Sequence, residues 1–224
     1  MPSTPSVIVF DVNETLSDMS PLGERFADVG APERLAKLWF AALLRDGFAL
    51  TAAGASERFA TLAATGLRGM LEGLSLNRDL DEAVRHIMEG FSHLSVHPDV
   101  PDGIHALREA GLRLATLSNG ATQVADRLLG TAGLRSAFER LLSVEDAGVW
   151  KPAAAAYEYA ARACDTSLTD MLLVAVHPWD IDGAARTGMR TAWIDRTGAR
   201  YPDYFTPPTH TVTTLGQLAY RLPG

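Results

Sequence analysis

The chain has 224 residues and a formal net charge of −7, from 20 Lys and Arg against 27 Asp and Glu. Its 47% hydrophobic content is that of a folded globular protein and excludes a disordered or collagen-like chain. The acidic balance argues against nucleic-acid binding, which needs clustered basic residues. A single cysteine, Cys164, excludes an intramolecular disulfide and a cysteine-based zinc site.

The first residues show no targeting pattern. Residues 1–6 contain no positive charge and no long apolar run. No window reaches the roughly 18 apolar residues that a membrane helix needs. We therefore expect a cytoplasmic protein without membrane association.

The first predicted element is a strand at residues 6–10, an apolar and β-branched run typical of a strand buried on both faces. The strand ends at Asp11, and the polar residues Asn13 and Thr15 follow closely. Open α/β sheets keep their reactive groups at the carboxyl ends of strands. Asp11 is therefore a candidate functional residue.

The next part of the chain shows only helical periodicity. The expected helices are 32–46, 55–65 and 79–91. We expect Gly47 to stop the first of these helices, and Ser56 and Asp79 to cap the other two. This stretch is predicted to be a helical insert that covers the site.

Strands and helices alternate from residue 98 onward. The expected strands are 112–117, 141–144, 171–176, 190–194 and 209–212, and the expected helices are 101–110, 122–129, 153–163, 181–187 and 215–221. This alternation predicts an α/β fold with a mostly parallel sheet covered on both faces. We expect a core formed by residues 1–17 and 98–224, with residues 18–97 inserted as a helical cap.

Polar residues follow several of these strands. Because the carboxyl ends of parallel strands share one edge, we expect Asp11, Ser118, Asn119, Lys151 and Asp180 to converge. These groups suit nucleophilic catalysis: a carboxylate nucleophile, small hydroxyl and amide donors, a lysine that keeps the carboxylate ionised, and a second carboxylate that activates water.

Four sequence motifs in order carry a family resemblance. They are residues 10–16 (FDVNETL), residues 116–120 (TLSNG), Lys151-Pro152 followed by Tyr157, and residues 179–184 (WDIDGA). With these motifs the chain resembles the haloacid dehalogenase superfamily, and within it the type II L-2-haloacid dehalogenases. The resemblance covers nearly the whole chain and implies a Rossmann-like parallel core with an inserted helical cap.

Two positions separate the chain from the superfamily's phosphatases. Those enzymes have an aspartate where this chain has Asn13, and an acidic Mg²⁺ ligand where it has Val176. The amide of Asn13 has no titratable proton to donate. The apolar side chain of Val176 removes one of the oxygen ligands that a hard cation such as Mg²⁺ prefers. We therefore expect a hydrolase that uses no metal and no other cofactor.

The resemblance also implies residue roles. Asp11 would attack the halogen-bearing carbon of a small 2-haloalkanoic acid, and Asp180 would activate the water that cleaves the resulting ester to a 2-hydroxy acid. The candidate catalytic residues are Asp11, Thr15, Ser118, Lys151, His177 and Asp180. The candidate substrate-binding residues are Val12, Asn13, Trp39, Phe40, Asn119, Tyr157 and Trp179. Asn119 would receive the halide, and Tyr157 would bind Lys151 or the substrate.

The chain departs from the dehalogenase pattern at further positions. Those enzymes usually have tyrosine at the place of Asn13, glycine at Glu14, an arginine at Phe40, and serine and asparagine at Ala175 and His177. The arginine is thought to help remove the halide, and Arg45 on the same helix is a candidate substitute. His177 is expected to hydrogen-bond the hydrolytic water.

Alternative interpretations stay open at this point. The chain would alternatively be a Mg²⁺-dependent phosphatase or a non-catalytic ligand-binding domain on the same fold. Asp180 would alternatively cap a helix, and Trp39 and Tyr157 would be core residues. His93 and His97 are better explained as part of an exposed linker than as a metal pair. A homodimer formed through the cap is possible.

Overall fold

The computed structural model describes residues 4–222, so the first three of residues 1–6, which are expected to lack a targeting pattern, lie outside the described residues. Within residues 4–222, six strands form a single sheet in the order β3-β2-β1-β4-β5-β6, and every neighbouring pair is parallel. The strands are β1 (Val7–Phe10), β2 (Arg113–Ser118), β3 (Arg140–Ser143), β4 (Met171–Ala175), β5 (Arg190–Ile194) and β6 (His210–Val212). The expected α/β fold with a parallel sheet is confirmed.

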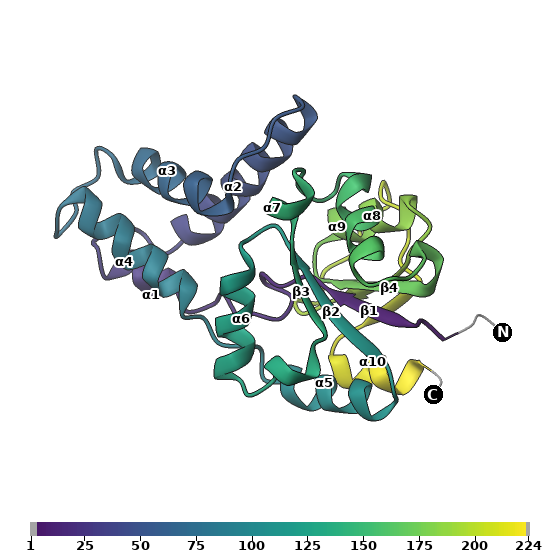
Figure 1. Cartoon of the computed structure of the whole chain (residues 1–224). Coiled ribbons are helices and arrows are strands. Elements are labelled where there is room, and N and C mark those ends of the chain that lie inside the picture. Colours follow the sequence, from purple (N-terminus) through teal and green to yellow (C-terminus); the bar gives the residue numbers. More distant parts are fainter. Residues whose placement is uncertain (1–3, 223–224) are drawn as a thin grey trace.

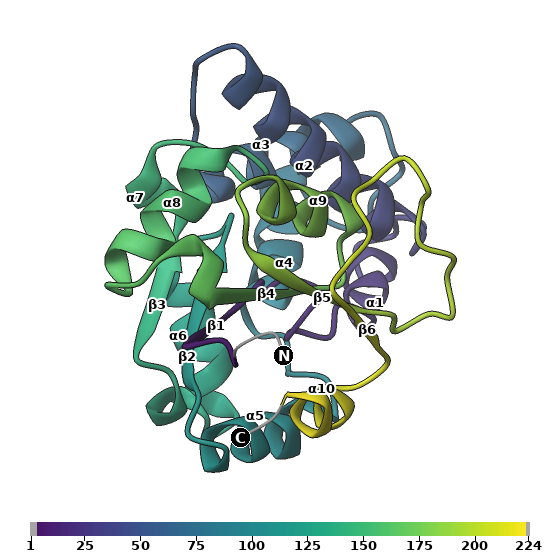
Figure 2. The same cartoon turned by 90° about the vertical axis from the view of Figure 1, so that its right-hand side faces the viewer.

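Helices cover both faces of this sheet. They are α5 (Val100–Glu109), α6 (Thr122–Thr131), α7 (Val144–Ala147), α8 (Ala154–Ala163), α9 (Pro178–Arg186) and α10 (Leu215–Arg221). Alternate residues of β1 point to opposite faces, so Ile8 packs in the cluster with α5, α6 and α10 while Val9 packs in the cluster with α8 and α9. Figure 2 shows α8 and α9 on one side of the strands and α5 and α10 on the other.

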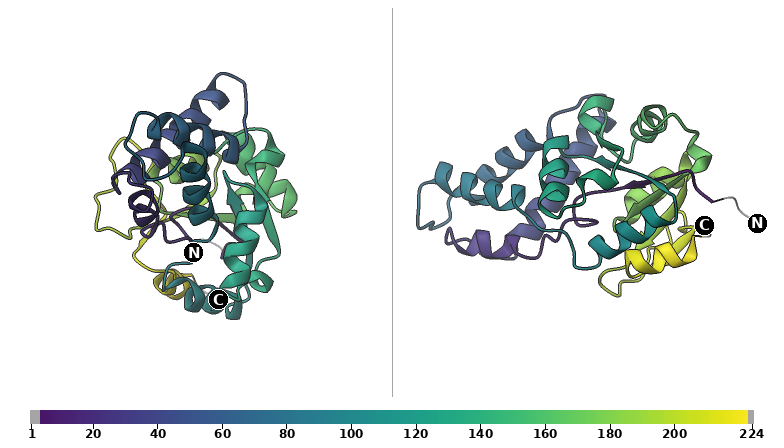
Figure 3. Two further views of the ribbon diagram at one scale, coloured as in Figure 1. Left: turned by 90° about the vertical axis from the view of Figure 1, so that its left-hand side faces the viewer. Right: turned by 60° about the horizontal axis from the view of Figure 1, so that its bottom comes forward.

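Four helices between β1 and α5 form a helical cap. They are α1 (Leu22–Ala27), α2 (Leu35–Ala52), α3 (Phe59–Leu71) and α4 (Leu80–Ser92). They lie together at one end of the molecule, facing the carboxyl ends of the strands (Figures 1 and 3). Among residues 4–222, no helix is long and apolar enough to cross a membrane.

Two predicted helix boundaries in the cap are wrong. Helix α2 continues through Gly47, because this glycine is buried against the Trp150 ring and a Cβ atom there would lie 2.4 Å from the ring. Helix α3 begins at Phe59 without a side-chain cap, so Ser56 does not cap it. Asp79 does cap α4 as expected, accepting from the Glu82 N–H at 2.8 Å.

The two chain segments that join the cap to the core run side by side. Ser17 and Val96 form an antiparallel bridge. Asp18 N–H donates to Ser95 O at 2.8 Å, and His97 N–H donates to Leu16 O at 2.9 Å. The crossing therefore lies next to the boundaries that the sequence suggests for the inserted segment.

Candidate active site

Asp11 lies directly after the central strand β1. Its N–H donates to Val174 O of β4 at 3.0 Å, which fixes the backbone at the sheet edge. The side chain is almost fully buried, and each carboxylate oxygen has a donor of its own. Lys151 Nζ donates to Oδ1 at 2.9 Å, and Thr15 Oγ1 donates to Oδ2 at 2.7 Å. Thr15 Oγ1 in turn accepts from Val176 N–H at 3.1 Å, so the threonine ties this loop to the end of β4.

Lys151 joins Asp11 to a second buried carboxylate. Its side chain is fully buried, and Nζ also donates to Asp180 Oδ2 at 2.5 Å. The other oxygen of Asp180 accepts from Tyr157 Oη at 2.6 Å. Tyr157 was expected to bind Lys151 or the substrate; its hydroxyl is instead directed at Asp180, with a further contact to Asp180 O at 3.2 Å.

The two carboxylates differ in acidity although they share one ammonium group. Burial raises the pKa of Asp11, but the charges of Lys151 and His177 and the hydrogen bonds from Thr15 and Lys151 outweigh it and bring the pKa below the usual range. Burial, together with the charge of Asp11, raises the pKa of Asp180 against the opposing effects of Lys151 and Tyr157. Asp11 is thus held ionised, whereas Asp180 is a stronger base than an ordinary aspartate.

Helix α9 packs closely against its neighbours and thereby brings Asp180 into the site. The helix begins at Pro178 rather than at the expected residue 181, so Asp180 lies inside the first turn and is not a cap. Gly183, one turn further, allows a tight approach, because a Cβ atom there would lie 2.5 Å from Pro152 Cβ and 2.7 Å from Tyr157 Oη. This approach brings Asp180 within reach of Lys151 and Tyr157.

Ser118 and Asn119 reach the site from the end of β2. Both side chains are buried, and Ser118 Oγ accepts from Gly120 N–H at 2.9 Å. Asn119 Oδ1 accepts from Lys151 N–H at 3.0 Å, which places the lysine backbone. The Nδ2 of Asn119 is buried and has no partner among the described residues, so it is a donor available to a ligand.

His177 and the rings of Trp179, Phe40 and Phe48 lie where the cap meets the core, and this group is called the cap–core wall below. His177 Nε2 lies 3.5 Å from Asp11 Oδ2. The imidazole stacks on Trp179, with ring centroids 5.0 Å apart, and Phe40 of α2 lies 6.4 Å away on the cap side. Phe48 of α2 meets Trp179 edge-on at 4.8 Å, so these rings also hold the cap against the core.

Other candidate binding residues lie farther from the reacting group. Trp39 is fully buried inside the cap, where its Nε1 donates to Ala63 O at 3.0 Å. The side chain of Val12 packs in the hydrophobic core with Phe10, which leaves its backbone as the part available to a ligand. Asn13 is buried beside the site and presents its carbonyl oxygen to His177 Nε2 at 3.2 Å.

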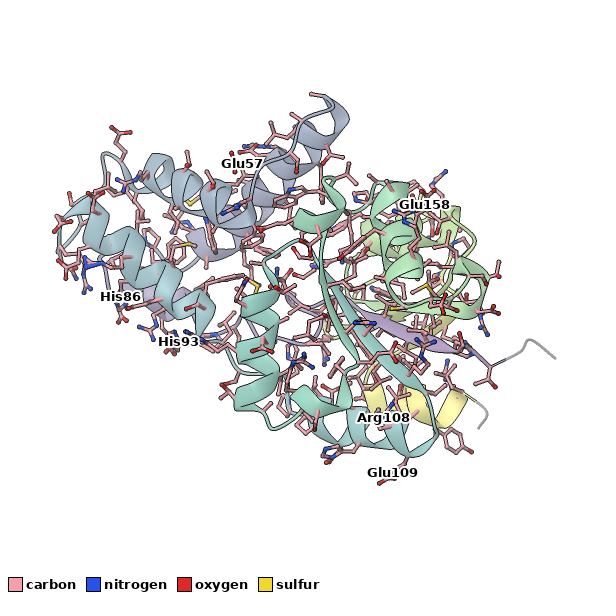
Figure 4. All side chains as sticks on the ribbon, in the orientation of Figure 1. Glu57, His86, His93, Arg108, Glu109 and Glu158 are labelled. Atoms are coloured by element: carbon pink, nitrogen blue, oxygen red, sulfur yellow. The ribbon has the colours of Figure 1, made fainter. Side chains whose placement is uncertain are left out.

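Sequence reasoning assigned no role to Trp150 or Glu14. Trp150 stacks on Phe59 of the cap, and its Nε1 donates to the backbone oxygen of Glu57, which lies just before α3 and is labelled in Figure 4. Its position next to Lys151 is the only sequence signal for this contact. Glu14 extends toward His177, with 3.7 Å between Oε2 and Nε2.

Arg45 is not a substitute for the missing arginine, because it is exposed on α2 and pairs with its neighbour Asp46. His93, at the end of α4 in Figure 4, bonds Glu89 O through Nδ1, while His97 bonds Glu14 O through Nε2 at 3.0 Å. Within residues 4–222, no group of three or more His, Cys, Asp or Glu side chains is placed to hold a metal ion.

This geometry defines a hydrolase with a carboxylate nucleophile. Asp11 is ionised and held by two donors, and Asp180 is a buried base beside it. The class agrees with the comparisons to known proteins. The family of haloacid dehalogenase-like hydrolases matches residues 5–188, and the chain belongs to this family.

Similar proteins cover nearly the whole chain. The (S)-2-haloacid dehalogenase of Pseudomonas sp. strain YL is 32% identical over 93% of this chain and 90% of its own length. The haloacetate dehalogenase H-2 of Moraxella sp. strain B is 29% identical over 96% of both chains. Among solved structures, a dehalogenase with an intermediate complex superposes with a TM-score of 0.92 at 27% identity, covering 100% of both chains.

Proposed function

We propose that the protein is a 2-haloacid dehalogenase that converts a small 2-haloalkanoic acid to the 2-hydroxy acid through an ester on Asp11. The observation that carries the proposal is that Lys151 pairs with two buried carboxylates, and that the pKa of Asp11 is lowered while the pKa of Asp180 is raised. The similar dehalogenases support it, because they cover nearly the full chain.

In the first step, a carboxylate oxygen of Asp11 attacks the halogen-bearing carbon. A C–O bond forms, the carbon–halogen bond breaks, and the halide leaves with the bonding electron pair. The low pKa of Asp11 keeps the nucleophile ionised, and its burial removes the water that would weaken it. Lys151 and Thr15 orient the carboxylate for this attack.

In the second step, water adds to the Cγ atom of Asp11. Asp180 takes a proton from the water, and the same proton passes to the 2-oxygen of the product as the ester bond breaks. Asp11 is left as a carboxylic acid and loses its proton to solvent, because its pKa is low. Tyr157 and Lys151 hold Asp180 for both transfers.

The substrate is held by the remaining groups of the site. Ser118, the free Nδ2 of Asn119 and the backbone around Val12 and Asn13 offer donors to the carboxylate and the leaving halide. Phe40 and Trp179 line the cap–core wall against the alkyl group, and His177 lies beside the nucleophile. Trp39 shapes this wall from inside the cap, since it packs against Phe40.

A phosphatase reaction fits these side chains poorly. The positions of the second aspartate and of the acidic metal ligand carry Asn13 and Val176, and the ammonium of Lys151 already occupies the space between Asp11 and Asp180. Mg²⁺ prefers several oxygen ligands in octahedral array, which this donor set does not supply. The metal-independent reaction is therefore favoured.

Halide release tests the proposed function. The wild type should release halide from 2-chloropropionate with a chelator present, Asp11→Asn should release none, and the exposed Asp46→Asn should match the wild type. Single-turnover hydrolysis in ¹⁸O water should place the label in Asp11. Turnover of a phosphomonoester that requires Mg²⁺, with no halide released from a panel of haloacids, would favour the phosphatase instead.

Three further expectations, on domain boundaries, oligomeric state and location, stay predictions. The first is that the core and cap meet at residues 17–18 and 97–98, and the bridge between Ser17 and Val96 supports it. A homodimer through the cap is consistent with Leu38, which is 58% exposed on α2, and light scattering of the purified protein tests it. A cytoplasmic location is tested by cell fractionation.

A further inference from the structure

Asn13 carries a buried side-chain amide that has no hydrogen-bond partner. The residue is 6% exposed, and among residues 4–222 it is hydrogen-bonded only through its backbone oxygen, which lies 3.2 Å from His177 Nε2. Buried polar groups are nearly always hydrogen-bonded, so a free one in an active site indicates a partner outside the chain. The amide of Asn13 is therefore a candidate ligand-binding group, as is the free Nδ2 of Asn119.

Gly120 leaves a space of about one methyl group beside this amide. A Cβ atom at Gly120 would lie 3.4 Å from Ser118 Oγ, 3.8 Å from Asn13 Nδ2 and 3.9 Å from Phe59 Cγ. Because these are van der Waals distances, a particle the size of a methyl group fits here without displacing its neighbours. A chloride ion has about that size, whereas a carboxylate group, with two oxygen atoms, is larger than this space.

The space lies on the cap side of the nucleophile. Phe59 begins helix α3 of the cap, whereas Asp11 directly follows strand β1 of the core. In a displacement at carbon, the leaving group departs on the side opposite the attacking oxygen. A halide displaced by Asp11 therefore moves away from the core and toward the space that Asn13 Nδ2 borders.

The cation that usually assists the halide is missing from this chain. Phe40 stands where the dehalogenase pattern has an arginine, and Arg45 is exposed on α2. Lys151 Nζ is already hydrogen-bonded to the carboxylates of Asp11 and Asp180. The charge of the halide is thus left to neutral donors, and an N–H group that donates to an anion forms a charge-assisted hydrogen bond.

We propose that the side-chain amide of Asn13 donates to the leaving halide in the space beside Gly120; this inference rests on the proposed function. As an oxygen of Asp11 forms the C–O bond, the carbon–halogen bond breaks and the halide takes the electron pair into this space. Its negative charge is small in the bound substrate and full in the released ion. The hydrogen bond from Asn13 therefore strengthens as the bond breaks and lowers the barrier of the first step. Ester hydrolysis involves no halide and gains nothing from this donor.

The donor and the space should affect different halides in opposite ways. Chloride is smaller than bromide, so an N–H group lies closer to its charge and stabilises it more. Loss of the donor should therefore slow chloride release more than bromide release, whereas loss of the space should slow the release of the larger bromide more. The ratio of the bromide to the chloride release rate should rise in Asn13→Ala and fall in Gly120→Ala.

Single-turnover kinetics with 2-chloropropionate and 2-bromopropionate tests the inference, with halide release and intact-protein mass followed together. In Asn13→Ala, chloride release should slow by about tenfold or more, bromide release should slow less, and hydrolysis of the ester should stay within about twofold of the wild type. Asn13→Leu has nearly the shape of the amide without its N–H groups, and it gives the same test if the alanine variant fails to fold.

Asn77→Ala is the matched control, because it removes an exposed amide of the cap that donates to Asp28 O at 2.9 Å, away from the site. Both of its halide release rates should equal those of the wild type.

The outcomes separate the two proposals. A wild type that releases no halide and forms no ester contradicts the proposed function and this inference with it. A wild type that turns over through the ester overturns this inference alone if chloride release in the Asn13 variants is slowed no more than ester hydrolysis, or if their ratio of bromide to chloride release does not rise.

Discussion

Lys151 shows how a single buried charge gives two carboxylates different roles. A fully buried ammonium is costly unless charges and hydrogen bonds compensate it, and here Asp11 and Asp180 do so and raise its pKa despite burial. Asp11 gains donors from Lys151 and Thr15 and stays ionised. Burial, together with the negative charge of Asp11, raises the pKa of Asp180 and makes it a stronger base. Such a separation of acidities assigns the nucleophile and the base.

The hydroxyl of Tyr157 should set the acid side of the pH profile. Its hydrogen bond lowers the pKa of Asp180, against the larger raising effect of burial. In Tyr157→Phe this pKa rises further, so Asp180 becomes protonated at a higher pH and loses its role as base there. The falling limb of kcat on the acid side should therefore move to higher pH.

Tyr159→Phe is the matched control, because that hydroxyl lies on the same helix and contacts the exposed Asp146 at 3.4 Å. Its pH profile should equal that of the wild type. An acid limb that stays in place in Tyr157→Phe would mean that Asp180 is not the base that limits turnover.

At the scale of elements, local signals predicted several boundaries and tertiary contacts changed others. The strand at 190–194 and the helix at 215–221 occur as expected, since alternation and flanking polar residues mark them. Gly47 was expected to end a helix on propensity alone, but the Trp150 ring packs against it and the helix continues. Propensity is a weak guide where a distant residue decides the packing.

The convergence of the candidate site followed from topology, but its fine contacts did not. Parallel strands place Asp11 and Ser118 at one edge wherever the helices lie. Which aromatic residue of α2 faces the core is a matter of helix rotation, so Phe40 reaches the wall while Trp39 turns into the cap. The approach of Glu14 to His177 depends on the positive φ of Glu14, which no sequence pattern predicts.

Gly183 should be essential for the position of α9. A methyl group in Gly183→Ala would overlap Pro152 Cβ and Tyr157 Oη, so α9 must move away from α8. Overpacking of this kind typically costs about 1–3 kcal/mol of unfolding free energy. Because the same shift separates Asp180 from Tyr157 and Lys151, kcat should fall by more than about tenfold. Urea unfolding and halide release measure the two effects.

Gly69→Ala is the control within a helix, since nothing lies within 4 Å of a Cβ atom at Gly69. It should stabilise the protein by up to about 1 kcal/mol, because alanine favours a helix, and leave kcat unchanged. Equal behaviour of the two variants would show that the close approach at Gly183 is not needed.

At the scale of the whole molecule, burial of the site implies motion. Asp11 is 3% exposed. The rings of Phe48 in α2 and Trp179 in α9 pack together where the cap meets the core, and this contact is called the seam below. The net charge of −7 does not attract an anionic substrate from a distance, so attraction must be local, through the buried Lys151. A substrate therefore needs an opening of the seam before it reaches this charge.

Hydrogen exchange should locate this opening at the paired crossing segments. We expect the hinges at residues 18–21 and 97–99, because these residues directly follow Ser17 and Val96, which form the bridge between the two segments. In Asp11→Asn saturated with 2-chloropropionate, which binds without turnover, amides of α2 and α9 along the seam should exchange more slowly than in the free variant. Helix α10 lies on the far face of the sheet and serves as the internal control, with no change expected. Equal exchange in the free and bound states along the seam would mean that cap and core move as one rigid unit, and that substrate enters without their separation.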